Sequence, residues 1–144
     1  MTDHTSSTVH AGPRTMGVAA LAGVAVVHLL DISSKFSETP YLGWAYVALI
    51  AGCLAAAAGI AGRDHPRAWA TGGHLCVGAF AAYCLSRSVG LPAATDDIGN
   101  WAEPLGLLAL AAEAIVVGAT VWTVRAQPAL ARVSERRQPV GSTR

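Results

Sequence analysis

Four apolar segments, each long enough to cross a lipid bilayer, make up most of this chain of 144 residues. The segments run over about residues 15–31, 41–61, 68–86 and 102–124. A helix needs about 20 apolar residues to span the hydrocarbon core of a bilayer. Lipid offers the backbone no hydrogen-bond partners, so each span is expected to be a helix. The sequence therefore predicts an all-α four-helix transmembrane bundle.

The connections between these segments are short, so sequential helices are expected to be antiparallel neighbours in an up-down-up-down bundle. We expect one transmembrane domain over residues 14–125, preceded by a flexible cytoplasmic tail at 1–13 and followed by a basic cytoplasmic tail at 126–144. Charged residues are only 13% of the chain, against about 25% in an ordinary soluble domain. This composition indicates a protein whose main partner is the lipid bilayer.

The positive charges indicate how the bundle is oriented. The 32–40 and 87–101 connections carry only Lys35 and Arg87, whereas the other basic residues lie in the two tails and the 62–67 connection: Arg14, Arg63, Arg67, Arg125, Arg132, Arg136, Arg137 and Arg144. Short cytoplasmic segments carry the excess of Lys and Arg. We therefore expect both termini to be cytoplasmic, in a multi-pass protein of a bacterial plasma membrane. The net charge of +1 favours no nucleic-acid partner.

The first segment is expected to remain in the mature chain rather than act as a cleaved signal. Its apolar part ends at His28-Leu-Leu-Asp31 and continues into a charged connection, without the small-residue site that a signal peptidase needs. Cys53, Cys76 and Cys84 lie inside spans without metal-ligand spacing, so we expect them to pack as small apolar side chains. We expect neither a metal nor a cofactor.

The connection between the third and fourth spans is the most polar part of the outward side. Arg87 is its only cation, and Asp96, Asp97 and Glu103 are its acids. We expect Arg87 to pair with at least one of these carboxylates and so to hold the connection against the bundle. The alternative is an acidic outward site for a cation or a polar ligand, because carboxylate oxygens suit hard cations.

Capping residues indicate where two of the helices begin. Thr39 stands before Pro40, and proline suits the first helical position of the second span. At the fourth span, Asn100 is expected to be the N-cap, with Glu103 three residues later completing a capping box.

Glu113 lies near the middle of the fourth span, where a charged carboxylate is costly. Gly106, Leu110, Glu113 and Val117 share one helical face, so we expect this face to point into the bundle. We expect Glu113 to be protonated and bonded to another span, with His74 as the suggested partner. The alternative is a functional carboxyl that couples proton movement to transport or contacts a polar substrate.

His28 and Asp31 lie three residues apart on one face of the first helix, near the outer surface. Their side chains can bond to each other, or to the outer connection and Arg87. His28 and His74 differ too much in depth to ligate one haem, by the rise of a helix.

Four runs of residues at the outer ends of the spans form a distinctive set. They are HLLD (28–31), KFSETPYLG (35–43), SRSVGLP (86–92) and DDIGNWAEPLG (96–106). With these runs the chain resembles, over residues 16–124, a group of small four-span bacterial membrane proteins of unknown function. The resemblance implies the four-span fold and no activity.

Function is less constrained by the sequence than fold. The favoured hypothesis is a non-enzymatic accessory or scaffold subunit, whose polar outward side contacts another membrane protein or a second copy of the chain. The alternative is a small transporter or proton-coupled carrier that works through Glu113. An enzyme ranks third because no nucleophile–base pair is visible. Glu113 separates the first two: a carrier needs it reachable by water and titrating, whereas an accessory subunit needs it only bonded.

Overall fold

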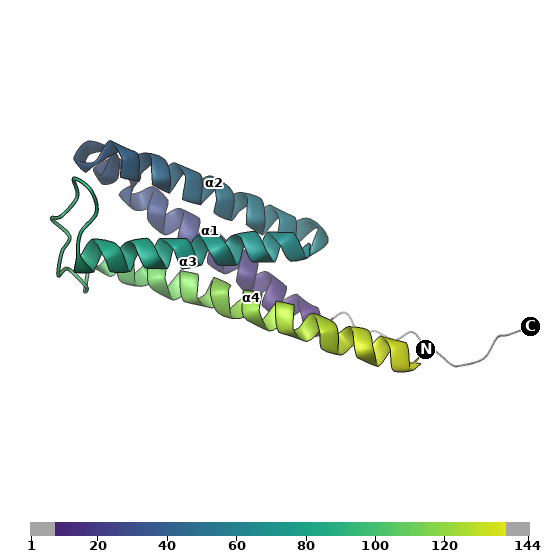
Figure 1. Ribbon diagram of the computed structural model, residues 1–144. Coiled ribbons are helices and arrows are strands. Elements are labelled where there is room, and N and C mark those ends of the chain that lie inside the picture. The colour runs from purple at the N-terminus through teal and green to yellow at the C-terminus, as the bar shows by residue number, and fades with distance from the viewer. Residues whose placement is uncertain (1–7, 138–144) are drawn as a thin grey trace, which may run out of the picture.

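The structure, a computed structural model, describes residues 8–137, with side chains described from residue 12 to residue 126. Within these residues the chain is all-α. Its helices are α1 (Thr8–Glu38), α2 (Pro40–Arg63), α3 (Pro66–Ser88) and α4 (Pro104–Arg137). They lie lengthwise in one elongated bundle (Figure 1). The all-α prediction is confirmed.

The helices extend beyond the apolar segments at several ends. α1 begins at Thr8, inside the segment expected to be a tail, and continues past Asp31 to Glu38. α4 continues to Arg137, well into the expected C-terminal tail. An apolar run marks the part of a helix that suits lipid, whereas backbone hydrogen bonding can continue into polar sequence. The rest of the two expected tails, 1–7 and 138–144, lies outside the described residues.

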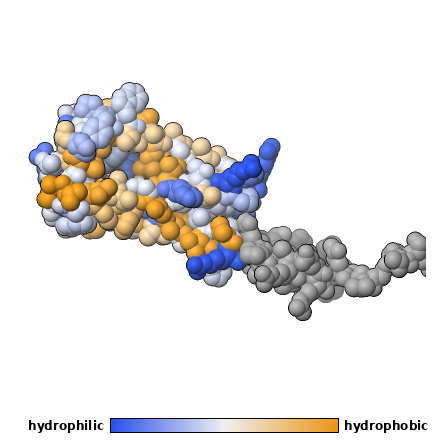
Figure 2. Space-filling model, in the orientation of Figure 1, coloured by the Kyte–Doolittle hydropathy of each residue, from blue (hydrophilic) through white to orange (hydrophobic). Residues whose placement is uncertain are grey.

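Three helical stretches are long and apolar enough to cross a membrane: Gly12–Glu38, Pro40–Arg63 and Pro104–Ala126. α3 forms where the 68–86 span is predicted, but it does not reach this level of apolarity, because Thr71, Gly72, Gly73 and His74 interrupt it. Figure 2 shows apolar residues over much of the visible side of the bundle, with the most hydrophilic residues mainly near its ends.

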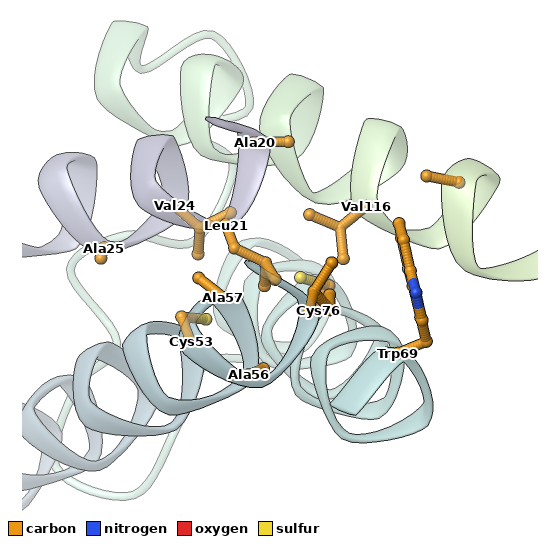
Figure 3. Close-up of a cluster of buried hydrophobic side chains, with 12 residues drawn as sticks. Ala20, Leu21, Val24, Ala25, Cys53, Ala56, Ala57, Trp69, Cys76 and Val116 are labelled. Carbon is orange, nitrogen blue, oxygen red and sulfur yellow. The ribbon is translucent and has the colours of Figure 1, made fainter. Parts of the chain in front are cut away.

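Each helix of the bundle packs against two others. α1 packs against α2 and α4, and α3 packs against the same two helices. All four helices contribute to a buried cluster, shown in Figure 3, in which the bulkiest fully buried side chains are Trp69, Leu21, Ile60, Val24 and Val116. The thiols of Cys53 and Cys76 are buried in this cluster, which confirms that they pack as apolar side chains.

The buried cluster lies toward the end of the bundle where α2 and α3 are connected. Glycines let these two helices approach closely there. A Cβ atom added at Gly59 would lie 2.8 Å from Ala68 Cβ, and one at Gly52 would lie 2.7 Å from Leu75 Cδ1. The Arg14 guanidinium donates to the Ala61 carbonyl at the same end.

At the opposite end the chain crosses between helices twice. Thr39 alone separates α1 from α2. Residues 89–103, here called the cap loop, join α3 to α4 and bond to the start of α2. The Thr39 hydroxyl donates to the Ala93 carbonyl at 3.3 Å, and the Tyr41 hydroxyl donates to the Pro92 carbonyl at 2.8 Å. The cap loop therefore covers this end of the bundle (Figure 1).

Candidate functional site

A cavity of about 480 Å³ lies between the helices, from the cap loop down to the depth of Glu113. Its wall is mainly apolar, and all four helices contribute to it. Among its apolar residues are Val27, Leu42, Leu49, Leu75, Ala79 and Leu110. Sites for small ligands have volumes of about 300–1,000 Å³ and mostly apolar walls with few polar groups. The cavity has the size and wall chemistry of such a site.

Glu113 lies at the inner end of this cavity. Its side chain is on the face of α4 that points into the bundle, as the helical spacing predicts, and the residue is only 3% exposed. Among the residues that the structure describes, its Oε2 atom has no hydrogen-bond partner. A buried polar atom without a partner costs free energy, so this carboxyl is a candidate for binding a ligand.

The expected bond between Glu113 and His74 does not form. His74 is exposed, and its Nδ1 atom lies 2.6 Å from the carbonyl of Ala70, one turn earlier in α3. One nitrogen of the imidazole is therefore hydrogen-bonded within α3 itself. His74 still lines the cavity near Glu113, but it leaves the carboxyl unpaired.

His28 and Asp31 are connected through Tyr46 of α2, a role that the sequence does not predict. The imidazole of His28 is buried, with Nδ1 2.9 Å from the Val24 carbonyl and its ring edge-to-face with Tyr46 at 4.8 Å between centroids. The Tyr46 hydroxyl donates to Asp31 Oδ2 at 3.4 Å. These three side chains form one polar part of the cavity wall.

Arg87 forms the predicted pair with the outer connection. Its guanidinium is 8% exposed; Nη1 lies 2.7 Å from Asp97 Oδ2, and Nη2 lies 4.0 Å from Glu103 Oε2. The guanidinium also stacks over the ring of Tyr83, 4.8 Å from its centroid. The Arg87 carbonyl accepts a hydrogen bond from Gly99 N at 2.8 Å. Arg87 thus holds the cap loop from both its side chain and its backbone.

Lys35 joins the same group of charges, which the sequence did not predict. Its ammonium lies 3.7 Å from Asp97 Oδ2 and 4.0 Å from Asp31 Oδ2. We call these charged residues at the outer end of the cavity the mouth cluster: Asp31, Lys35, Arg87, Asp97 and Glu103. With three acids and two bases, the mouth cluster has a formal charge of −1. Lys35 was missed because the first span was expected to end at Asp31. The helix α1 continues to Glu38, so Lys35 lies one turn after Asp31 on the same helical face.

Glu103, and not Asn100, caps α4. The Glu103 carboxylate accepts hydrogen bonds from the backbone N–H groups of Leu105 at 2.9 Å and Gly106 at 2.5 Å. Pro104 takes the first helical position, where a missing N–H is harmless. The helix therefore starts later than the predicted 102, and the capping box at Asn100 is wrong. Asn100 and Asp96 lie exposed on the cap loop.

The arrangement of charges suits cations and hydrogen-bond donors. A buried carboxyl closes the inner end of an apolar cavity, and a cluster of net negative charge surrounds its outer end. In the part of the chain that the structure describes, no three His, Cys, Asp or Glu side chains form a group that could hold a metal ion. The cavity thus combines an apolar wall, one buried carboxyl at its inner end and charged groups at its outer end.

No protein-family model, no curated protein sequence and no solved structure matches this chain. The resemblance to small four-span bacterial membrane proteins stays a prediction. The cavity, Glu113 and the mouth cluster are consequently the observations from which function is inferred.

Proposed function

We propose that this protein is a small multi-pass membrane carrier, and that Glu113 binds and releases a proton as a ligand leaves and enters the cavity. The observation that supports this most directly is the Glu113 carboxyl itself, which is buried, unpaired and in contact with a cavity. An accessory subunit would need this carboxyl only as a bonded structural group. The contact of this unpaired carboxyl with the cavity supports the carrier over the accessory subunit.

The proposed carrier places all four helices across a bacterial plasma membrane, up-down-up-down, with both termini in the cytoplasm and the cap loop outside. Three apolar helices support this placement. α3 packs against α2 and α4, and its charged residues Arg67 and Arg87 lie at its two ends. The distribution of basic residues supports the orientation.

Proton exchange at Glu113 follows from simple competition for one carboxylate. In the empty cavity the carboxyl carries a proton, since a lone charge in an apolar bundle is costly. A ligand with a positively charged donor binds the carboxylate, and the displaced proton leaves to water. When a proton returns to Glu113, the ligand loses its ionic partner and is released. One proton is exchanged for each positively charged ligand.

An apolar carbodiimide tests this role, because it reacts with a protonated carboxyl in an apolar environment to form a stable N-acylurea. In proteoliposomes, mass spectrometry is expected to locate the adduct on Glu113, with a yield that falls as the pH is raised, because only the protonated carboxyl reacts. Glu113→Gln provides the control and should give no adduct at position 113. Infrared difference spectra over the same increase in pH should lose one carboxyl band in this variant. A Glu113 that neither reacts nor titrates would refute the proposal.

A role as an accessory subunit has one observation in its favour. Three apolar residues of the cap loop, Val89, Ile98 and Trp101, are exposed on the proposed outer surface, where a protein partner could cover them. Co-purification from native membranes tests this role: Ile98→Ser should lose a partner that Glu113→Gln retains. The carrier predicts the reverse dependence, with function lost only in Glu113→Gln.

A further inference from the structure

α2 and α3 form a wedge that is closed at one end and open at the other. Near their connection the two helices are close, at Gly59 with Ala68 and at Gly52 with Leu75. Toward the cap loop they diverge, as Figure 1 shows. The cavity lies in the diverging part, so its position follows from the angle between these two helices.

Small, exposed residues line the open part of the wedge. Ala45 and Ala48 on α2, and Gly78 and Ala82 on α3, are exposed at the surface of the bundle and also line the cavity. A Cβ atom added at Gly78 would meet nothing within 4 Å. From these accessible residues of the cavity wall we infer that the cavity opens on the side of the bundle. In the proposed membrane orientation this side faces lipid.

The end of the cavity that faces water is covered by the cap loop, unlike the side between α2 and α3. Asp97 of the cap loop is bound by Arg87 at 2.7 Å and lies 3.7 Å from Lys35. The loop is also bonded to Thr39 and Tyr41 at the start of α2. A ligand therefore has a less obstructed path between α2 and α3 than through the cap loop.

The chemistry of the cavity defines the ligand class. An apolar wall suits a hydrocarbon body, and the unpaired Glu113 carboxyl needs a donor or a positive charge. The net charge of the mouth cluster disfavours an anion. A molecule that meets all three conditions, and that dissolves in lipid, is an amphipathic amine.

We propose that an amphipathic amine, with one hydrocarbon chain and one ammonium group, enters the cavity from the bilayer between α2 and α3 and binds Glu113. This inference rests on the proposed carrier function and names its ligand class and entry path.

The test uses three photoreactive probes of equal chain length, each with a diazirine on the chain: an alkylamine, an alkyl alcohol and an alkanoic acid. In proteoliposomes the amine should label residues 75–82 and 106–113 more than the acid by about tenfold, since a hydrogen bond to a charged group contributes about 1.5–3 kcal/mol. Glu113→Gln should reduce amine labelling to the level of the alcohol.

The entry path has its own matched pair of variants. Ala82→Trp places a large ring in the wedge, whereas Ala81→Trp places the same ring on an exposed position of α3 that does not line the cavity. Amine labelling should slow in Ala82→Trp alone. Equal labelling in the two variants would refute entry between α2 and α3.

Equal labelling by all three probes would show simple partition into an apolar space and would refute the amine assignment. If Glu113 still reacts with carbodiimide and titrates in that case, the ligand class is wrong and the carrier function stands. If Glu113 neither reacts with carbodiimide nor titrates, the carrier function is refuted, and the ligand assignment that rests on it is refuted as well.

Discussion

The two ends of this bundle hold the same helices together in different ways. Near the α2–α3 connection, small residues bring the helices together around the indole of Trp69, and the interior is filled. Near the cap loop, the helices stand further apart, long charged side chains bridge them, and a cavity remains. In lipid, close packing depends on small residues at the interface. Small residues line both ends, so the ends differ in the close approach of α2 and α3 at Gly59 and Gly52 and in the charged side chains that bridge the helices near the cap loop.

The contrast predicts that truncating the packed end has the largest effect. Trp69 is fully buried, donates from Nε1 to Asp64 Oδ1 at 2.7 Å and packs against Gly17. Trp69→Ala should lower the free energy of unfolding by about 3–5 kcal/mol, as large-to-small substitutions in cores do. Thermal unfolding in detergent measures it. Trp122→Ala, at a position that is 66% exposed, should cost far less, and equal losses would mean that the packed end is not the stable one.

The next largest effect is expected at the cap loop. Arg87→Ala removes the 2.7 Å ion pair with Asp97 and the 4.0 Å pair with Glu103, and it leaves Asp97 without its main partner. Both carboxylates are partly exposed, so the cost should lie near the lower limit for a broken buried pair, about 3 kcal/mol. Lys35→Ala should cost about 1 kcal/mol or less, because the 3.7 Å pair with Asp97 is longer and Glu38 is exposed. Similar losses in the two variants, measured by thermal unfolding, would argue against Arg87 as the main anchor.

One glycine from each end tests the wedge directly. Gly59→Ala should destabilise the protein by about 1–3 kcal/mol, because its Cβ atom would lie 2.8 Å from Ala68 Cβ. Gly78→Ala meets open space and should be neutral or stabilise by about 0.5–1 kcal/mol through the helix preference of alanine. The comparison needs only unfolding midpoints of the two variants. The same sign in both would contradict the wedge.

The smallest expected effect separates the two candidate caps of α4. Glu103→Ala removes the acceptor of the Leu105 and Gly106 N–H groups and should cost about 1 kcal/mol. Asn100→Ala should change stability by a few tenths of a kcal/mol, as exposed substitutions do. Denaturant titration of both variants measures the difference. A larger loss in Asn100→Ala would restore the capping box that the sequence predicts.

The sequence predicted the helices and the Arg87 pair because each depends on a local signal. An apolar run of about 20 residues leaves few alternatives to a helix in lipid, and an isolated cation beside three acids leaves few alternatives to a pair. The cap of α4 was missed because both Asn100 and Glu103 are good candidates, and the fold of the intervening loop, with Gly99 at a φ of +81°, decides between them.

The cavity could not be predicted because it depends on distances between helices. The divergence of α2 from α3 is set by contacts such as Gly59 with Ala68, which link positions on different helices. The role of Tyr46 was hidden for the same reason, since its partners His28 and Asp31 lie on α1. The expected partner of Glu113, His74, bonds instead to the Ala70 carbonyl of its own helix, a choice that the sequence does not indicate.

The close contact between α2 and α3 at the closed end of the wedge is also a point about which α2 can rotate. α2 contains 24 residues, which makes it about 36 Å long at the helical rise per residue. Gly59, which contacts Ala68, lies about 28 Å from the start of α2, so a rotation of about 5° about this contact would move that start by about 2.5 Å. That displacement is enough to separate Tyr41 from Pro92 and Thr39 from Ala93, whose bonds are 2.8 and 3.3 Å long. A small change in the angle of α2 would thus release the cap loop from this helix.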